Sequence, residues 1–134
     1  MLKPIMIKKD DLSPKVILDV ERNIFLISGK SIVENAHDFY NPILSWFQTY
    51  LKNPNDSTHL VLYLEYLNSS SALQISNLIH LFTLHQEESN LSITWLYDTD
   101  DETMREIGEE YLYSNNLKFE TKELETTDFE EFEF

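Results

Sequence analysis

The chain has 134 residues, of which 42% are hydrophobic, and this length fits one folded domain with a substantial core. It contains no cysteine, which excludes disulfides, thiolate catalysis and cysteine-ligated metal sites. The formal net charge of -14 argues against nucleic acids and anionic lipid surfaces as partners, and favours proteins that carry basic patches.

Residues 1–14 are expected to form an N-terminal extension that does not resemble a signal peptide. Pro4 interrupts its apolar residues, and the charged run 8–11 follows at once. No stretch of the chain approaches the roughly 20 apolar residues that a membrane span requires. We therefore expect neither export nor membrane insertion, and we predict a cytoplasmic location.

The first predicted elements are two strands, over 15–20 and 24–28, and the short polar break between them indicates an antiparallel hairpin. Asn35 is a suitable N-cap for a helix whose apolar residues recur at three- and four-residue steps as far as Leu51. Pro42 lies within this run, so we expect it either to kink the helix or to mark its true start.

The remaining elements alternate between strand and helix. A nearly continuous apolar run over 59–66 predicts a central strand that is covered on both faces. We then expect a helix over 71–88, a strand over 90–97, a helix over 101–114 and a strand over 117–124. The order β-β-α-β-α-β-α-β predicts a single α/β domain over 15–124, with a mixed five-stranded sheet and about three helices.

Residues 125–134 form an acidic C-terminal tail without a basic residue. A solvated terminus is its simplest interpretation. A docking segment is the open alternative, because tails that only improve solubility rarely carry regularly spaced aromatic residues such as Phe129, Phe132 and Phe134.

Several kinds of site can be discounted, and we expect no metal and no cofactor. The two isolated glycines cannot form a loop that cradles phosphate. His80 and His85 lie five residues apart, which is off the four-residue step that directs two helical side chains to one metal. The acids that begin at Asp98 are spaced as in a calcium loop, but Thr103 occupies the position that needs glycine.

The junction Asn68-Ser69-Ser70-Ser71 lies between the most apolar predicted strand and the next helix. Open α/β sheets place functional groups at the carboxyl ends of their strands. Asn and Ser are also preferred helix N-caps, so the run could simply start the helix. Both interpretations are compatible, because a phosphoryl group of about -1.5 to -2 charges would meet free backbone N–H groups and the positive end of the helix dipole.

The sequence is similar to the SiaC family of bacterial regulatory phosphoproteins, which are related in architecture to STAS-type anti-anti-sigma factors. The resemblance covers about Val16 to Glu123. Four stretches carry it. The first two are 27–36 and the pair Phe39-Tyr40 with Pro42, Leu44 and Trp46. The other two are 64–71 and Trp95-Leu96-Tyr97-Asp98, which is followed by the acidic helix to Tyr111.

The resemblance implies a module that a Ser/Thr protein kinase phosphorylates and a PP2C-type phosphatase dephosphorylates. It also implies that the unmodified form binds and activates a diguanylate cyclase, and so regulates cyclic-di-GMP. The family's phosphoacceptor is usually the Thr of an Asn-Thr-Ser-Ser motif. That position is Ser69 here, and Ser70 is a rival acceptor.

We therefore predict a phosphorylation-switched regulatory protein that is not an enzyme. Its partner-binding residues are predicted to be Asn68, Ser70, Ser71, Glu34, Asn35 and Glu65. One alternative is a small hydrolase or ligand-binding enzyme domain, which needs a concave polar pocket with perturbed acids. The other is a constitutive scaffold protein, for which modification would make no difference to binding.

Overall fold

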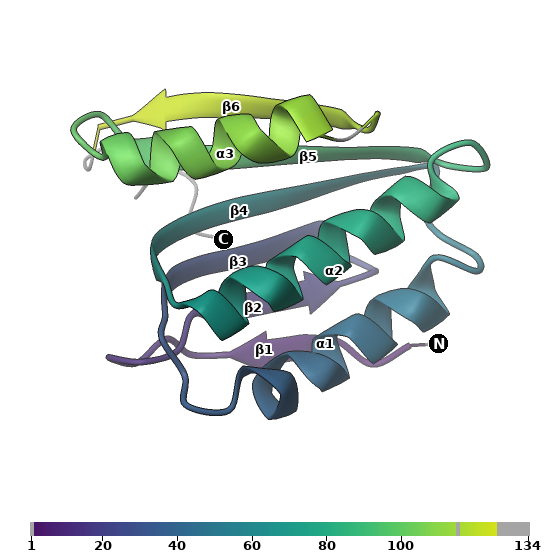
Figure 1. The fold of residues 1–134 in the computed structure, drawn as a ribbon. Helices are drawn as coiled ribbons and strands as arrows, with labels where there is room; N and C mark the ends of the chain where they lie inside the picture. The colour runs from purple at the N-terminus through teal and green to yellow at the C-terminus, as the bar shows by residue number, and fades with distance from the viewer. Residues whose placement is uncertain (1, 115, 126–134) are drawn as a thin grey trace.

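The computed structural model describes residues 2–114 and 116–125, which form one six-stranded sheet and three helices (Figure 1). The helices are α1 (Ala36–Tyr50), α2 (Ser69–His85) and α3 (Glu102–Ser114). The strands are β1 (Ile5–Ile7), β2 (Lys15–Asp19), β3 (Ile24–Ser31), β4 (Ser57–Leu67), β5 (Asn90–Asp98) and β6 (Lys118–Leu124). The α/β class and the predicted helices are confirmed.

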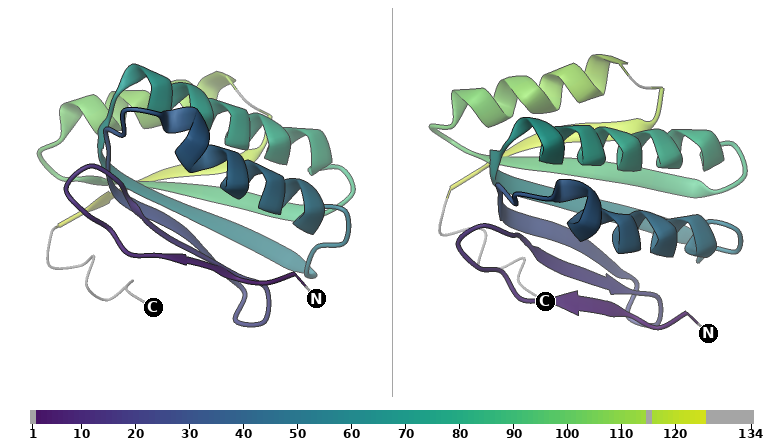
Figure 2. Two further views of the ribbon diagram at one scale, coloured as in Figure 1. Left: turned by 90° about the horizontal axis from the view of Figure 1, so that it is seen from below. Right: turned by 60° about the horizontal axis from the view of Figure 1, so that its bottom comes forward.

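The strands lie side by side in chain order, from β1 to β6. The pairs β1–β2 and β2–β3 are antiparallel, which confirms the predicted hairpin, whereas β3 to β6 pair in parallel. Each parallel connection passes through one helix, and the three helices lie together on one face of the sheet (Figures 1 and 2). The carboxyl ends of β3, β4 and β5 therefore all lead into helices at the same edge of the sheet.

The described sheet has one strand more than the five that we predicted. This strand, β1, lies within the stretch 1–14 and pairs with β2. Three residues are too few to show an alternating pattern, and Pro4 directly precedes them, so the local sequence carries no strand signal. Ile5 and Ile7 nevertheless pack against the main core.

The helix α1 begins where its cap predicted. The side chain of Asn35 accepts a hydrogen bond from the backbone N–H of Asp38 at 3.2 Å. Pro42 lies inside the helix, so it does not mark the helix start. The buried side chains of Tyr40, Ile43 and Phe47 pack into the core on either side of Pro42, and this packing offsets the one backbone hydrogen bond that proline removes.

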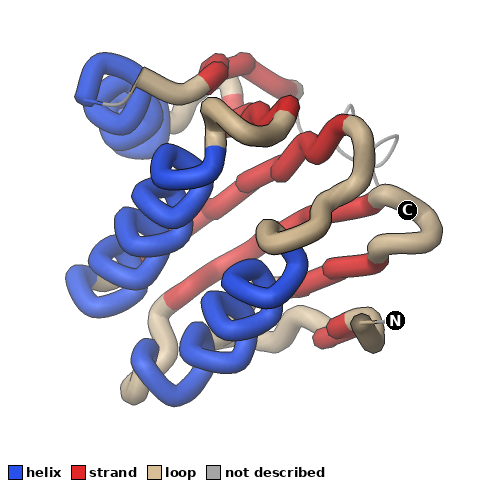
Figure 3. The backbone as a smooth tube through the Cα atoms, turned by 90° about the vertical axis from the view of Figure 1, so that its right-hand side faces the viewer, coloured by secondary structure: helices blue, strands red, loops and turns tan. Residues whose placement is uncertain are grey.

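The main core lies between the helices and the sheet, and aromatic side chains dominate it. Phe25 on β3 contacts the rings of Trp46, Phe47 and Tyr50 on α1. Figure 3 shows the helices (blue) as one layer and the strands (red) as the other. The sequence predicted that β4 is covered on both faces, but in the described residues helices cover only one of them.

Two further expectations concern segments near the ends of the chain. Of the predicted tail, only Glu125 belongs to the described part, so Phe129, Phe132 and Phe134 lie outside the described residues. None of the helices in the described residues is both long and apolar enough to span a bilayer.

Candidate functional site

Asn68 connects the carboxyl end of β4 to the first turn of α2. Its backbone is extended, and its side-chain oxygen accepts a hydrogen bond from the backbone N–H of Ser71 at 2.9 Å. Its side-chain amide donates to the carbonyl oxygen of Val33 at 3.1 Å, and its backbone N–H donates to the carbonyl oxygen of Ser31 at 3.1 Å. Asn68 therefore caps α2 and also fixes the helix start against the end of β3.

The three serines that follow Asn68 differ in exposure. Ser69 and Ser70 occupy the first two positions of α2, and their side chains are exposed. Ser71 is 0% exposed. The hydroxyl of Ser70 reaches the side-chain oxygen of Asn68 at 3.4 Å, near the limit of a hydrogen bond. A modifying enzyme can therefore approach Ser69 and Ser70, whereas Ser71 points into the interior.

Ser71 belongs to a chain of buried hydroxyls. Ser31 donates to the hydroxyl of Ser71 at 2.8 Å, and the hydroxyls of Ser31 and Tyr40 lie 2.7 Å apart. Because the proton of Ser31 is directed to Ser71, Tyr40 donates to Ser31. Burial raises the pKa of Tyr40 to about 12, so its hydroxyl stays protonated at neutral pH. This chain joins the start of α2, the end of β3 and the second turn of α1.

The structure divides the other predicted partner-binding residues between two faces. Glu34 and Asn35 are exposed in the loop after β3, next to the Val33 carbonyl that Asn68 contacts. Glu65 is also exposed, but its side chain lies on the face of the sheet opposite the helices, because Leu64 and Leu62 face the helical core. The junction thus gathers Glu34, Asn35 and the serines, while Glu65 lies apart from them.

Glu65 instead belongs to an acidic area around Tyr63. The hydroxyl of Tyr63 donates a hydrogen bond to a carboxylate oxygen of Asp98 on the neighbouring strand. Burial raises the pKa of Tyr63 most strongly, followed by the hydrogen bond to Asp98 and the charges of Asp98, Glu65 and Asp101. The Tyr63 hydroxyl therefore stays protonated at neutral pH. In the described residues no group of three or more His, Asp or Glu side chains could hold a metal ion.

The sequence analysis missed two exposed apolar side chains that lie close to Ser69 along the chain. Tyr66 lies two residues before Asn68, and Leu73 lies in the first turns of α2. Both are largely exposed. Leu73 could have been noticed, because it falls outside the buried stripe of Ile75, Ile79 and Phe82 on the same helix. Leu67 packs against the main core, so the side chain of Tyr66 before it points to the opposite face of the sheet. We call Glu34, Asn35, Asn68, Ser69, Ser70 and Leu73 the junction surface.

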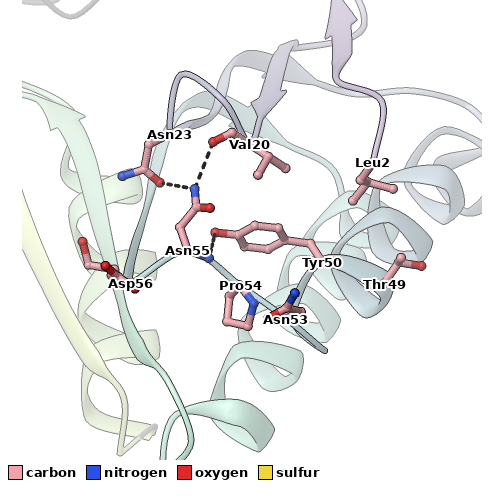
Figure 4. A pocket seen from close by; sticks show the side chains of 10 residues that line it. Leu2, Val20, Asn23, Thr49, Tyr50, Asn53, Pro54, Asn55 and Asp56 are labelled. Carbon is pink, nitrogen blue, oxygen red and sulfur yellow. Dashed lines mark hydrogen bonds between the residues drawn. The ribbon is translucent and has the colours of Figure 1, made fainter.

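A hollow of about 770 Å³ lies at the opposite edge of the sheet, where β4 begins (Figure 4). The side chain of Asn55 crosses it and donates to the carbonyl oxygen of Val20 at 3.0 Å and to the side-chain oxygen of Asn23 at 2.9 Å. Asp56 contributes the one carboxylate among its lining residues. A hydrolase usually needs a pair of acid–base groups, and this hollow does not supply one from those residues.

The sequence matches one family model and one related protein. Residues 7–124 match the family model described as SiaC family regulatory phosphoprotein. An uncharacterized protein of Pseudomonas aeruginosa strain UCBPP-PA14 is 27% identical over 100 residues, which cover 74% of this chain and 79% of that protein.

Solved structures share the fold. SiaC of Pseudomonas aeruginosa superposes with a TM-score of 0.83 at 23% identity, covering 91% of this chain and 99% of that one. The structure of the diguanylate cyclase SiaD in complex with its activator SiaC, from the same organism, superposes with a TM-score of 0.83 at 24% identity. The match covers 90% of this chain and 99% of that one. The family match spans most of the chain, including the whole junction surface. The chain therefore belongs to the SiaC family of regulatory phosphoproteins.

Proposed function

We propose that phosphorylation of Ser69 switches this protein between a state that binds a signalling partner and one that does not. The observation that carries the proposal is the exposed Ser69 hydroxyl at the first position of α2, beside a cap that does not use it. Ser70 is the rival acceptor. Ser71 is the least suited of the three, because its hydroxyl is buried and bonded to Ser31.

The fold can tolerate a phosphate at this position. The first turn of a helix presents backbone N–H groups without intrahelical partners, and the helix dipole favours negative charge there by about 0.3–1 kcal/mol. The contacts that hold the helix start run through Asn68 and Ser71, so modifying Ser69 leaves them in place. The modification therefore changes the surface while the domain stays folded.

The neighbours of Ser69 favour binding by the unmodified form. Leu73, four residues after Ser69 on α2, offers exposed apolar area that a partner can bury. A phosphate beside Leu73 adds about -1.5 to -2 charges, which would have to be desolvated in such an interface. Glu34 adds like charge at the same edge. The expected direction is that phosphorylation weakens partner binding.

The partner classes come from the family. SiaC of Pseudomonas aeruginosa forms a complex with the diguanylate cyclase SiaD as its activator, and we propose a diguanylate cyclase as the partner of this chain. A Ser/Thr kinase and a PP2C-type phosphatase would set the phosphorylation state. ATP-dependent modification implies a cytoplasmic location, and in this scheme the protein regulates an enzyme without being one.

Mass spectrometry after co-expression with a kinase encoded beside this gene tests the acceptor. We expect phosphate on the intact protein at Ser69, its loss in Ser69→Ala, and no loss in Ser45→Ala, which changes an exposed serine on α1. Phosphate found exclusively outside 69–71 would refute the proposal.

Calorimetric binding to a diguanylate cyclase from the same genome tests the switch. We expect Ser69→Asp to weaken binding by about tenfold or more, and Ser69→Ala to bind like the unmodified protein. Equal binding of both variants would instead support the constitutive scaffold.

A further inference from the structure

Four polar side chains on three neighbouring strands are joined by hydrogen bonds on the face of the sheet opposite the helices. His59 and Ser92 lie opposite each other in the register of β4 and β5, and Nδ1 of His59 is 2.6 Å from Oγ of Ser92. Nε2 of His59 is 2.8 Å from Oγ1 of Thr94, and Thr94 donates to Oε1 of Glu120 on β6 at 2.9 Å. We call Ser92, His59, Thr94 and Glu120 the sheet-face network.

The hydrogen-bond partners fix where the protons of the network lie. A carboxylate can only accept, so the one hydroxyl proton of Thr94 is directed to Glu120. Oγ1 of Thr94 therefore accepts from Nε2 of His59, which must carry the ring proton. In the neutral imidazole Nδ1 is then without a proton and accepts the hydroxyl proton of Ser92.

This arrangement couples a nucleophile to a base. An activated serine needs a base within hydrogen-bond reach and a further group that orients the base, and the network supplies His59 in the first role and Thr94 in the second. The carboxylate of Glu120, reached through Thr94, favours the imidazolium that forms when Ser92 gives up its proton. His59 is exposed and Ser92 is partly exposed, so a small reagent can reach them.

Lys118 adds a positive charge beside the serine. It is the register partner of Ser92 on β6, and its neighbour Phe119 packs into the helical core, so Lys118 points to the same face as the network. Lys118, Ser92 and His59 line a common hollow of about 380 Å³. An ammonium at this position attracts a reagent with a negatively charged leaving group and stabilises the charge that grows on that group. An acyl phosphate has this chemistry.

We infer that Ser92 is a second covalent modification site, which takes an acyl group from an acyl phosphate. Oγ of Ser92 attacks the carbonyl carbon of the donor while its proton passes to Nδ1 of His59. The bond between that carbon and the phosphate oxygen breaks, and the departing phosphate takes the proton from His59. The products are an O-acyl serine and inorganic phosphate.

This site does not depend on the switch at Ser69. His59 and Ser92 lie near the amino ends of β4 and β5, whereas Ser69 follows the carboxyl end of β4. Each chain takes one acyl group at Ser92, so the reaction modifies the protein without turnover. The acyl group replaces a polar hydroxyl on the open face of the sheet with a larger, less polar ester.

Incubation of the full chain with acetyl phosphate, followed by peptide mass spectrometry, tests the inference. Hydroxylamine separates the products, because it cleaves serine esters and leaves acetylated lysines intact. We expect one hydroxylamine-sensitive acetyl group, on Ser92, which is absent in Ser92→Ala and forms at the same rate in Ser45→Ala, a change at an exposed serine of α1. His59→Gln should slow acetylation of Ser92 by about a hundredfold or more.

Thr94 is a positioning residue and has its own test. Thr94→Val removes the hydroxyl that orients His59 and should slow acetylation of Ser92 several-fold, whereas Thr94→Ser keeps a hydroxyl and should restore the rate. Circular dichroism checks that both variants are folded.

Either of two outcomes would overturn the inference. Acetyl groups confined to lysines would show that Ser92 is not an acceptor. Acetylation of Ser92 that is equally fast in His59→Gln would show that the hydroxyl reacts without help from the network. If His59→Gln does not fold, equal rates in Thr94→Val and Thr94→Ser lead to the same conclusion.

Discussion

Gly108→Ala is expected to destabilise the domain, although the same change in most helices is favourable. Gly108 lies in α3 directly against Trp95, which is fully buried on β5. A Cβ atom at position 108 would lie 2.3 Å from Cδ1, 2.7 Å from Nε1 and 2.9 Å from Cγ of that indole. Real Cβ atoms do not approach other atoms so closely, so either the ring or the helix must move.

Both movements cost free energy, and these costs set the expected loss in the free energy of unfolding. The indole N–H of Trp95 donates to the carbonyl oxygen of Met104 at 2.9 Å, so displacing the ring strains or breaks that bond at a cost of about 1 kcal/mol. Overpacking a tight core costs about 1–3 kcal/mol. Replacing helical glycine with alanine contributes about 1 kcal/mol in the other direction. The net loss in the free energy of unfolding is therefore about 1–3 kcal/mol.

Urea denaturation of Gly108→Ala, followed by tryptophan fluorescence, measures this loss. Glu106→Ala is the matched control, because Glu106 is exposed on the same helix and its replacement should change stability by about 0.5 kcal/mol at most. If Gly108→Ala unfolds at the same or a higher urea concentration than the unmodified chain, the close packing of α3 on Trp95 is refuted.

Two further changes probe the junction. Tyr40→Phe removes one hydroxyl of the buried chain while Ser31 keeps Ser71, so we expect a loss of about 0.5–1.5 kcal/mol at neutral pH by urea denaturation. The pKa of Tyr40 rises from 10.0 to about 12 on folding, so its contribution is complete below pH 10 and is lost towards pH 12. Between pH 10 and pH 12 the free energy of unfolding of Tyr40→Phe should therefore fall less than that of the unmodified protein. An equal fall in both proteins, followed by circular dichroism, would contradict this. Asn68→Ala removes the cap of α2 and its bond to Val33, so the free energy of unfolding should fall by about 0.5–2 kcal/mol. Asn77→Ala, at an exposed position of the same helix, is the control, and an equal loss in both variants would argue against the cap.

The order and type of the predicted elements could be read from local patterns. Apolar residues repeat with the period of a helix or strand within each segment, and Asn35 and Asn68 sit at the starts of α1 and α2. The position of the serine run at a strand-to-helix junction followed from the same patterns. The family resemblance, now confirmed, added the choice of Ser69 among three similar hydroxyls.

Other features depend on contacts between distant parts of the chain. The strand β1 exists because it can pair with β2, and its own sequence carries no signal for it. The burial of Ser71 depends on Ser31, which lies 40 residues away, and the place of Glu65 depends on which face of β4 the helices cover. Local periodicity shows that a segment has two sides, but which side is buried is settled by what packs against it.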